Sequence, residues 1–100
     1  MTYYSHTSQS VNGEMMFSVY QPPQLKKGKR LPALTYLAGL TCTQETFMIK
    51  GGAQQFAAKY GIILIAPDTS PRGAGIAGEE DSWDFGTGAG FYIDACKEEW

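Results

Sequence analysis

The sequence predicts an α/β fold in which an antiparallel hairpin leads into a βαβ unit of a mostly parallel sheet. Between residues 33 and 66, an apolar strand pattern, a helical pattern and a second apolar strand pattern follow one another. Before them, the pair Asn12-Gly13 separates two extended segments, which is typical of a hairpin. A strand–helix–strand connection makes its two strands parallel, with a right-handed crossover.

Composition indicates one small globular domain and argues against several classes of partner. The chain has 100 residues, of which 43% are hydrophobic and 18% charged. A net charge of −2 argues against nucleic acid or an anionic membrane as the main partner. There is no apolar run of ~18 residues, and Met1–Ser10 lacks the apolar core of a signal peptide. We therefore expect a cytoplasmic protein in which Cys42 and Cys96 are free thiols.

The predicted hairpin joins residues 4–10 to Met15–Tyr20 through a type I′ turn at Asn12-Gly13. Phe17 and Val19 share one face of the second strand, which should be partly buried. A loop with four basic residues follows, namely Lys26, Lys27, Lys29 and Arg30. These charges could bind phosphate or nucleic acid, but without interleaved aromatic residues a solvated loop is the favoured interpretation.

The βαβ unit begins with Ala33–Ala38, an almost continuously apolar strand. Thr43 is a candidate cap for the following helix, with Glu45 in its first turn, and Gly51-Gly52 should interrupt that helix. A second helix then carries apolar residues at helical spacing and should end at a left-handed Gly61. The helical residues are Ala53, Phe56, Ala57 and Tyr60. The strand Ile62–Ala66 shows no alternation, which predicts burial on both faces.

Residues 67–90 form an unusually long stretch without helix or strand pattern. The stretch leaves the carboxyl end of a parallel strand, where open α/β sheets place their ligand sites. Near its start, Asp68 and Arg72 should pair and fix the path of the chain away from the sheet. Four acidic residues could hold calcium, but their spacing fits no EF-hand, so a loop with internal caps is favoured. They are Glu79, Glu80, Asp81 and Asp84.

The segment Ser82–Tyr92 combines large aromatic residues with closely spaced glycines. The aromatic residues Trp83, Phe85, Phe91 and Tyr92 are expected to be buried, and the glycines Gly86, Gly88 and Gly90 to allow close backbone approach. Together they predict the wall of a pocket. A dinucleotide or phosphate loop is disfavoured, because the G-x-G-x-x-G spacing and a Lys-Ser/Thr sequel are missing.

The turn Gly39–Thr43 links a buried strand to a helix. In α/β-hydrolases such a turn presents a backbone N–H to the oxyanion, and the alternative is an ordinary capped loop. Cys42 could be a nucleophile at a helix N-terminus, but it would need a basic partner. The single histidine, His6, lies on the polar first strand, so we favour a buried structural Cys42 beside a pocket and a surface or hairpin His6.

Three runs together resemble the S-formylglutathione hydrolases, the esterase D family. They are Gly39–Thr43, Ala66–Gly73 and Asp81–Asp94, and the similarity extends from Tyr4 to Trp100. The resemblance implies the N-terminal part of an α/β-hydrolase fold. It further implies a serine thioesterase that hydrolyses S-formylglutathione to formate and glutathione, a step of formaldehyde detoxification, in the cytoplasm and without cofactor or metal. A homodimer of the full-length enzyme is compatible with it.

The resemblance also implies a site. Its Ser-Asp-His triad has no counterpart here, because the chain contains no G-x-S-x-G. One of the family's two oxyanion donors maps onto the backbone N–H of Leu40, and a cysteine that is not the nucleophile maps onto Cys42. Expected substrate-binding residues are Gly39, Thr41, Cys42, Trp83 and Phe85.

We therefore expect residues 1–100 to form an incomplete α/β-hydrolase domain of hairpin, oxyanion turn, first βαβ unit and pocket-wall loop. Alone, the chain should be inactive and marginally folded, because the apolar strand Ala33–Ala38 lacks a neighbour on one side. Two alternatives remain open. One is a catalytically inactive remnant that acts only as a binding or interaction module. The other is a related hydrolase for a different acyl substrate.

Overall fold

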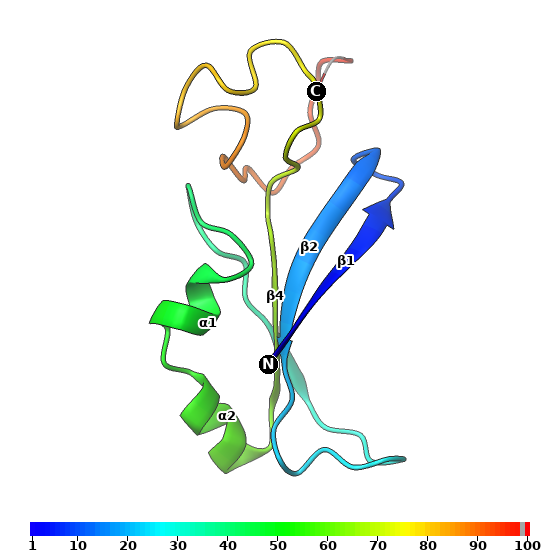
Figure 1. Ribbon diagram of the computed structural model, residues 1–100, viewed down its shortest axis with the longest axis vertical. Helices are drawn as coiled ribbons and strands as arrows, with labels where there is room; N and C mark the ends of the chain where they lie inside the picture. Colours follow the sequence, from blue (N-terminus) through cyan, green and yellow to red (C-terminus); the bar gives the residue numbers. More distant parts are fainter. Residues whose placement is uncertain (99) are drawn as a thin grey trace.

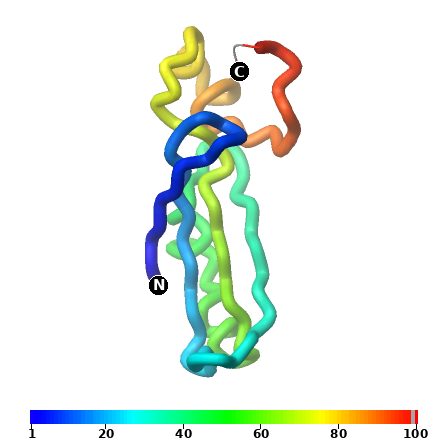
Figure 2. Tube along the Cα trace, turned by 90° about the vertical axis from the view of Figure 1, so that its right-hand side faces the viewer, coloured from blue at the N-terminus to red at the C-terminus, as the bar shows by residue number. Residues whose placement is uncertain are grey.

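A computed structural model describes residues 1–98 and 100 and shows a four-stranded mixed sheet with helices on one face (Figures 1 and 2). The strand order is β1-β2-β4-β3, and the molecule measures 46 × 26 × 19 Å. Only β3 and β4 are parallel, whereas β2 is antiparallel to both β1 and β4. The sheet thus combines the predicted hairpin with the predicted βαβ unit.

The hairpin consists of β1 (Thr2–Ser8) and β2 (Gly13–Tyr20). Its turn differs from the expected two-residue type I′ turn at Asn12-Gly13. Gly13 already pairs with Ser8, so the loop comprises residues 9–12. Asn12, at φ 48°, supplies the left-handed conformation that closes this longer loop. The hairpin is therefore confirmed, whereas the predicted turn type is wrong.

The βαβ unit is also confirmed, although its first strand and its helices are shorter than expected and its second strand begins one residue later. It consists of β3 (Ala33–Thr35), α1 (Thr46–Lys50), α2 (Gln54–Tyr60) and β4 (Ile63–Pro67). The expected strand Ala33–Ala38 pairs with β4 over three residues, and the Tyr36 N–H adds one further bond to the Ile65 carbonyl at 2.8 Å. Strand β3 lies at the edge of the sheet.

The two helices begin and end for different reasons. Helix α1 starts at Thr46, so the prediction that Thr43 caps it is wrong. Instead, the Thr43 hydroxyl accepts the Glu45 N–H at 3.2 Å, and the Thr46 hydroxyl accepts the Thr43 N–H at 3.1 Å, which makes a turn before the helix. The predicted ends are confirmed: Gly51 terminates α1, and Gly61 terminates α2 in the left-handed conformation at φ 69°.

The core lies between the helices and the sheet. Its buried members are Met48, Ala57, Leu64 and Ala66, with Tyr20, Phe47, Ala53 and Ile62 packed around them. In β4 the residues that face the helices are buried, but Ile63 and Ile65 on the other face are only half-buried. The prediction that this strand is buried on both faces is therefore wrong, because the helices cover only one face.

A buried hydroxyl joins the sheet to the segment before α1. Ser18 in β2 is fully buried and donates to the Gln44 carbonyl at 2.6 Å. Its oxygen also lies 3.4 Å from the Ala66 carbonyl of β4. The residues that follow the turn after β3 are thereby held against the centre of the sheet.

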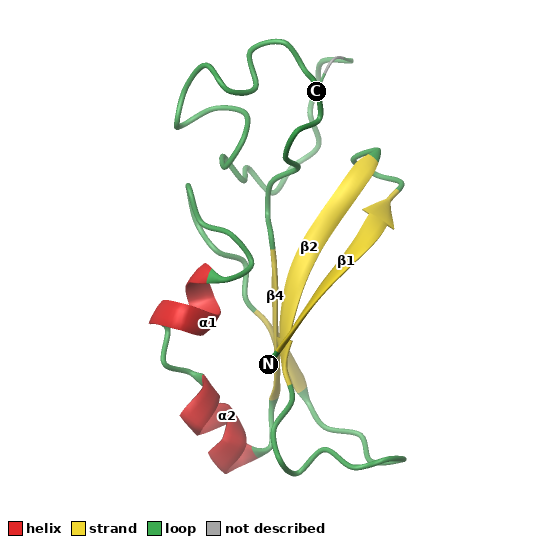
Figure 3. Ribbon diagram, viewed as in Figure 1, coloured by secondary structure: helices red, strands yellow, loops and turns green. Residues whose placement is uncertain are grey.

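From Asp68 onward, the described residues contain no helix and only one isolated bridge, Ser82↔Phe85 (Figure 3). The predicted long loop is thus confirmed, and it leaves the carboxyl end of β4 (Figure 3). Neither helix of the described part is long and apolar enough to cross a membrane.

Candidate functional site

The turn Gly39–Thr43 leaves the carboxyl end of β3 and leads toward α1. Ala38, just before it, is buried, whereas the Leu40 side chain is 42% exposed. Thr41 has φ 66°, a left-handed conformation that costs a non-glycine residue about 1–2 kcal/mol. Such a conformation persists only where surrounding contacts hold it, and backbone outliers of this kind cluster at functional sites.

The backbone amides of this turn fall into two groups. The Thr41 N–H donates to the Gly88 carbonyl at 2.9 Å, and the Cys42 N–H donates to the Gly39 carbonyl at 3.1 Å. Within the described residues, the N–H groups of Gly39 and Leu40 have no acceptor. Stabilisation of a transient oxyanion requires an N–H that is free to donate and is held in a fixed direction by its neighbours.

A pocket of about 190 Å³ lies beside the turn. It is lined by Tyr36, Ala38, Gly39, Cys42, Thr46, Phe47, Lys50 and Gly51. Tyr36 and Phe47 stack there with ring centroids 4.1 Å apart. Cys42 is a free thiol and only half-buried, so its predicted place beside a pocket is confirmed while its full burial is not.

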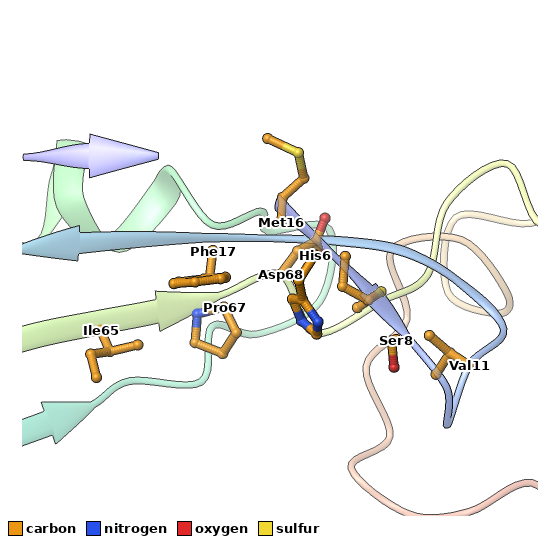
Figure 4. Close-up of a pocket in the computed structure, with 9 residues that line it drawn as sticks. His6, Ser8, Val11, Met16, Phe17, Ile65, Pro67 and Asp68 are labelled. Atoms are coloured by element: carbon orange, nitrogen blue, oxygen red, sulfur yellow. The ribbon is translucent and has the colours of Figure 1, made fainter. Parts of the chain in front are cut away.

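His6 belongs to a different pocket, of about 290 Å³, on the hairpin side of the sheet (Figure 4). Its exposed ring lies edge-on to Phe17 with centroids 5.9 Å apart, as a hairpin side chain, which confirms the prediction for His6. The pocket is lined by His6, Ser8, Val11, Met15, Met16, Phe17, Ile65, Pro67 and Asp68. Cys42 lines the other pocket, so the structure does not bring together a thiol and an imidazole.

The predicted pair of Asp68 and Arg72 is confirmed. Arg72 Nε donates to Asp68 Oδ2 at 2.6 Å, and Arg72 Nη2 donates to Oδ1 at 3.2 Å. Asp68 is buried, and its hydrogen bond raises the pKa of Arg72. Arg72 Nη2 also donates to the Cys42 carbonyl at 3.1 Å, so the pair reaches the turn as well as fixing the path of the chain.

The acidic residues of the loop bind its own donors. Glu79 accepts the Gly75 N–H at 2.9 Å, and Glu80 accepts the Thr87 hydroxyl at 2.8 Å. Asp84 accepts the Ser82 hydroxyl. Within residues 1–98 and 100, no three metal-ligating side chains gather. The interpretation as an internally capped loop is confirmed.

The aromatic residues of Ser82–Tyr92 are not buried, contrary to the prediction. Trp83 is 70% exposed, and Phe85, Phe91 and Tyr92 are between 49% and 58% exposed. Glycines make the close contacts of this segment instead: a Cβ on Gly90 would lie 2.7 Å from Thr69 Oγ1, and one on Gly88 would lie 3.6 Å from the Thr41 Cα. The aromatic rings are left exposed, and Tyr92 reaches inward only to bond the Ala38 carbonyl through its hydroxyl. Phe85 packs against Phe91 with ring centroids 6.1 Å apart.

The expected site residues are thus only partly brought together. Gly39 and Cys42 share a pocket and Leu40 and Thr41 lie in the same turn, but Trp83 and Phe85 line neither pocket. Sequence reasoning missed Ser70, whose buried hydroxyl accepts the Gly88 N–H at 2.9 Å. It also missed the hydroxyls of Thr69 and Tyr92, which both donate to the Ala38 carbonyl. No spacing rule predicts such contacts between distant loops.

Comparison with known proteins identifies the family. The Esterase family model matches residues 8–100, and the chain belongs to this family. Over 97 residues it is 55% identical to an S-formylglutathione hydrolase of Mus musculus and 54% identical to that of Bos taurus. Each match covers 97% of this chain and 34% of the relative. The chain thus spans about a third of the length of these relatives.

A solved structure confirms the fold class. The S-formylglutathione hydrolase from Agrobacterium tumefaciens superposes with a TM-score of 0.89 at 43% sequence identity. The superposition covers 98% of this chain and 35% of that one. The hairpin and βαβ unit are therefore part of an α/β-hydrolase fold.

Proposed function

We propose that this chain provides the amino-terminal part of a serine thioesterase that hydrolyses S-formylglutathione to formate and glutathione. The observation that carries the proposal is the unpaired N–H of Leu40 in a turn whose following amides are fixed. The identity of 55% and 54% to two S-formylglutathione hydrolases supports the choice of substrate. In this proposal residues 1–100 are an incomplete α/β-hydrolase domain.

Attack on the thioester carbonyl converts its oxygen into an oxyanion, and the Leu40 N–H stabilises this charge by donating to it. The donor is most useful when it is already in position, because no reorganisation then accompanies the reaction. The chain has no G-x-S-x-G, so the nucleophile, its base and the second oxyanion donor must come from sequence beyond these 100 residues. By itself the chain is therefore inactive.

The remaining site residues belong to the same proposal. Gly39, Thr41 and Cys42 border the reacting carbonyl, and Trp83 and Phe85 contact the substrate. The last two would have to meet it with side chains that are exposed here. The proposal needs no metal or cofactor. It retains the cytoplasmic location that the resemblance implies and is compatible with a homodimer of the full-length enzyme.

A chimera tests the proposed function. The matching 97 residues of the mouse enzyme are replaced by those of this chain, and hydrolysis of S-formylglutathione is measured. We expect hydrolysis by the chimera and none by the 100-residue chain above the uncatalysed rate. A chimera that folds but does not hydrolyse the thioester contradicts the proposal and favours the alternative of a binding module.

A further inference from the structure

Two segments that follow β4 hold the turn Gly39–Thr43 from both ends. Before the turn, the Ala38 carbonyl accepts the Thr69 hydroxyl at 3.3 Å and also the Tyr92 hydroxyl. Near its other end, Arg72 Nη2 donates to the Cys42 carbonyl. Between these points, Gly88 accepts the Thr41 N–H at 2.9 Å. Every one of these partners comes from residues 69–72 or 88–92.

Ser70 connects these two segments. Its side chain is buried, and its hydroxyl accepts the Gly88 N–H at 2.9 Å while donating to the Pro71 carbonyl at 3.1 Å. Its own N–H donates to Asp68 Oδ1 at 3.2 Å. Gly88 is buried too, so loss of the hydroxyl would leave a buried N–H without a partner.

We propose that Ser70 is a positioning residue for the oxyanion turn. Its hydroxyl fixes the Gly88 peptide, the Gly88 carbonyl fixes the Thr41 N–H, and Thr41 fixes the peptide that follows Leu40. This inference rests on the proposed role of the Leu40 N–H. Ser70 does not touch the reacting atoms; it acts through Gly88.

The strain at Thr41 explains why such a support is needed. At φ 66° this residue would relax toward right-handed or extended backbone if its N–H were released. The Leu40–Thr41 peptide would turn with it, and the Leu40 N–H, which lies one peptide earlier, would lose its fixed direction. Ser70 does not belong to the core cluster between helices and sheet. Its removal should therefore loosen the turn while β4 remains paired.

Amide hydrogen exchange followed by NMR on the chimera tests this inference without reference to activity. In Ser70→Ala the buried Gly88 N–H loses its partner, so the Gly88 carbonyl is no longer held against Thr41. We therefore expect the Thr41 amide to exchange about tenfold faster or more. Amides of β4 should keep their rates. Ser70→Thr retains the hydroxyl and should restore slow exchange. Ser82→Ala is the matched control, since that hydroxyl bonds only to the nearby Asp84.

Three results would overturn the inference. They are a Thr41 amide that is unprotected in the chimera with Ser70 intact, one whose exchange is unchanged in Ser70→Ala, and one that is accelerated no more than the amides of β4. The last result would assign Ser70 a general structural role. In the chimera, Ser70→Ala should lower kcat and leave KM unchanged, whereas a rise in KM alone would contradict positioning. An inactive chimera would contradict the proposed function and leave the exchange result intact.

Discussion

In the proposed function Leu40 acts through its backbone, so this role can be tested by removing an N–H rather than a side chain. In the chimera, Leu40→Pro deletes the donor, because proline has no N–H. We expect kcat to fall about 10²–10³-fold, as for the loss of one oxyanion-hole donor. Leu40→Ala keeps the N–H and should lose far less in the same S-formylglutathione assay. Equal losses in the two variants would argue against the backbone role.

Arg72 illustrates how one side chain serves both stability and the site. Arg72→Met leaves the carboxylate of buried Asp68 without its partner and frees the Cys42 carbonyl. We expect the chimera to lose about 1–2 kcal/mol of unfolding free energy in urea, a value reduced because the Arg72 side chain is 38% exposed. Arg30→Met, at an exposed loop position, is the control and should change little. An equal loss of unfolding free energy in Arg72→Met and Arg30→Met would show that the ion pair of Arg72 and Asp68 does not stabilise the fold.

At the scale of elements, Gly61 determines how α2 gives way to β4. Gly61→Ala would place a Cβ in ordinary contact with Gln24, at 3.9 Å, so the φ of 69° alone makes the change unfavourable. We expect a loss of about 1–2 kcal/mol in the unfolding free energy of the chimera. Gly13→Ala is the control, because its φ is not positive and its nearest neighbour is 3.7 Å away. A neutral Gly61→Ala would contradict the account of this helix end.

The elements that were predicted from sequence are those with a strong local signal. Gly61 and the apolar spacing before it predict α2, and the apolar run from Ile62 predicts β4. The start of α1 differs from the prediction because Thr43 does not cap the helix. Its N–H donates to the Thr46 hydroxyl and its own hydroxyl accepts the Glu45 N–H, which makes a turn before the helix begins. The exposed Trp83 was missed because composition predicts burial but not the direction in which a side chain points.

Only the turn of the candidate site has a local signal in the sequence. A strand, a glycine and a helix start predict a βα turn at Gly39–Thr43, whereas the oxyanion role of Leu40 follows only from the resemblance and stays a prediction. The support by Ser70 could not be predicted, since a buried serine 18 residues from its partner Gly88 leaves no periodic signal.

At the scale of the whole molecule, the sheet edge formed by β3 is the feature that most favours aggregation. Strand β3 lies at the end of the strand order, and Leu34, Tyr36 and Leu37 beside that edge are 44–52% exposed. Such edges pair with other chains. We expect the 100-residue chain to aggregate and Leu37→Lys to slow this, as measured by light scattering. Ile49→Lys removes a residue that is 66% exposed but lies in helix α1 and not in a strand, and it should have less effect.

The hydrogen bonds between the turn Gly39–Thr43 and the later loop residues also determine the order in which these parts can fold during synthesis. A growing polypeptide folds from its amino-terminal end while the rest is still being made. The strands β3 and β4 can pair as soon as Pro67 has left the ribosome, but Thr41 must wait until Gly88 has been added. The nascent chain therefore carries a nearly finished sheet before the turn Gly39–Thr43 acquires its last hydrogen bonds.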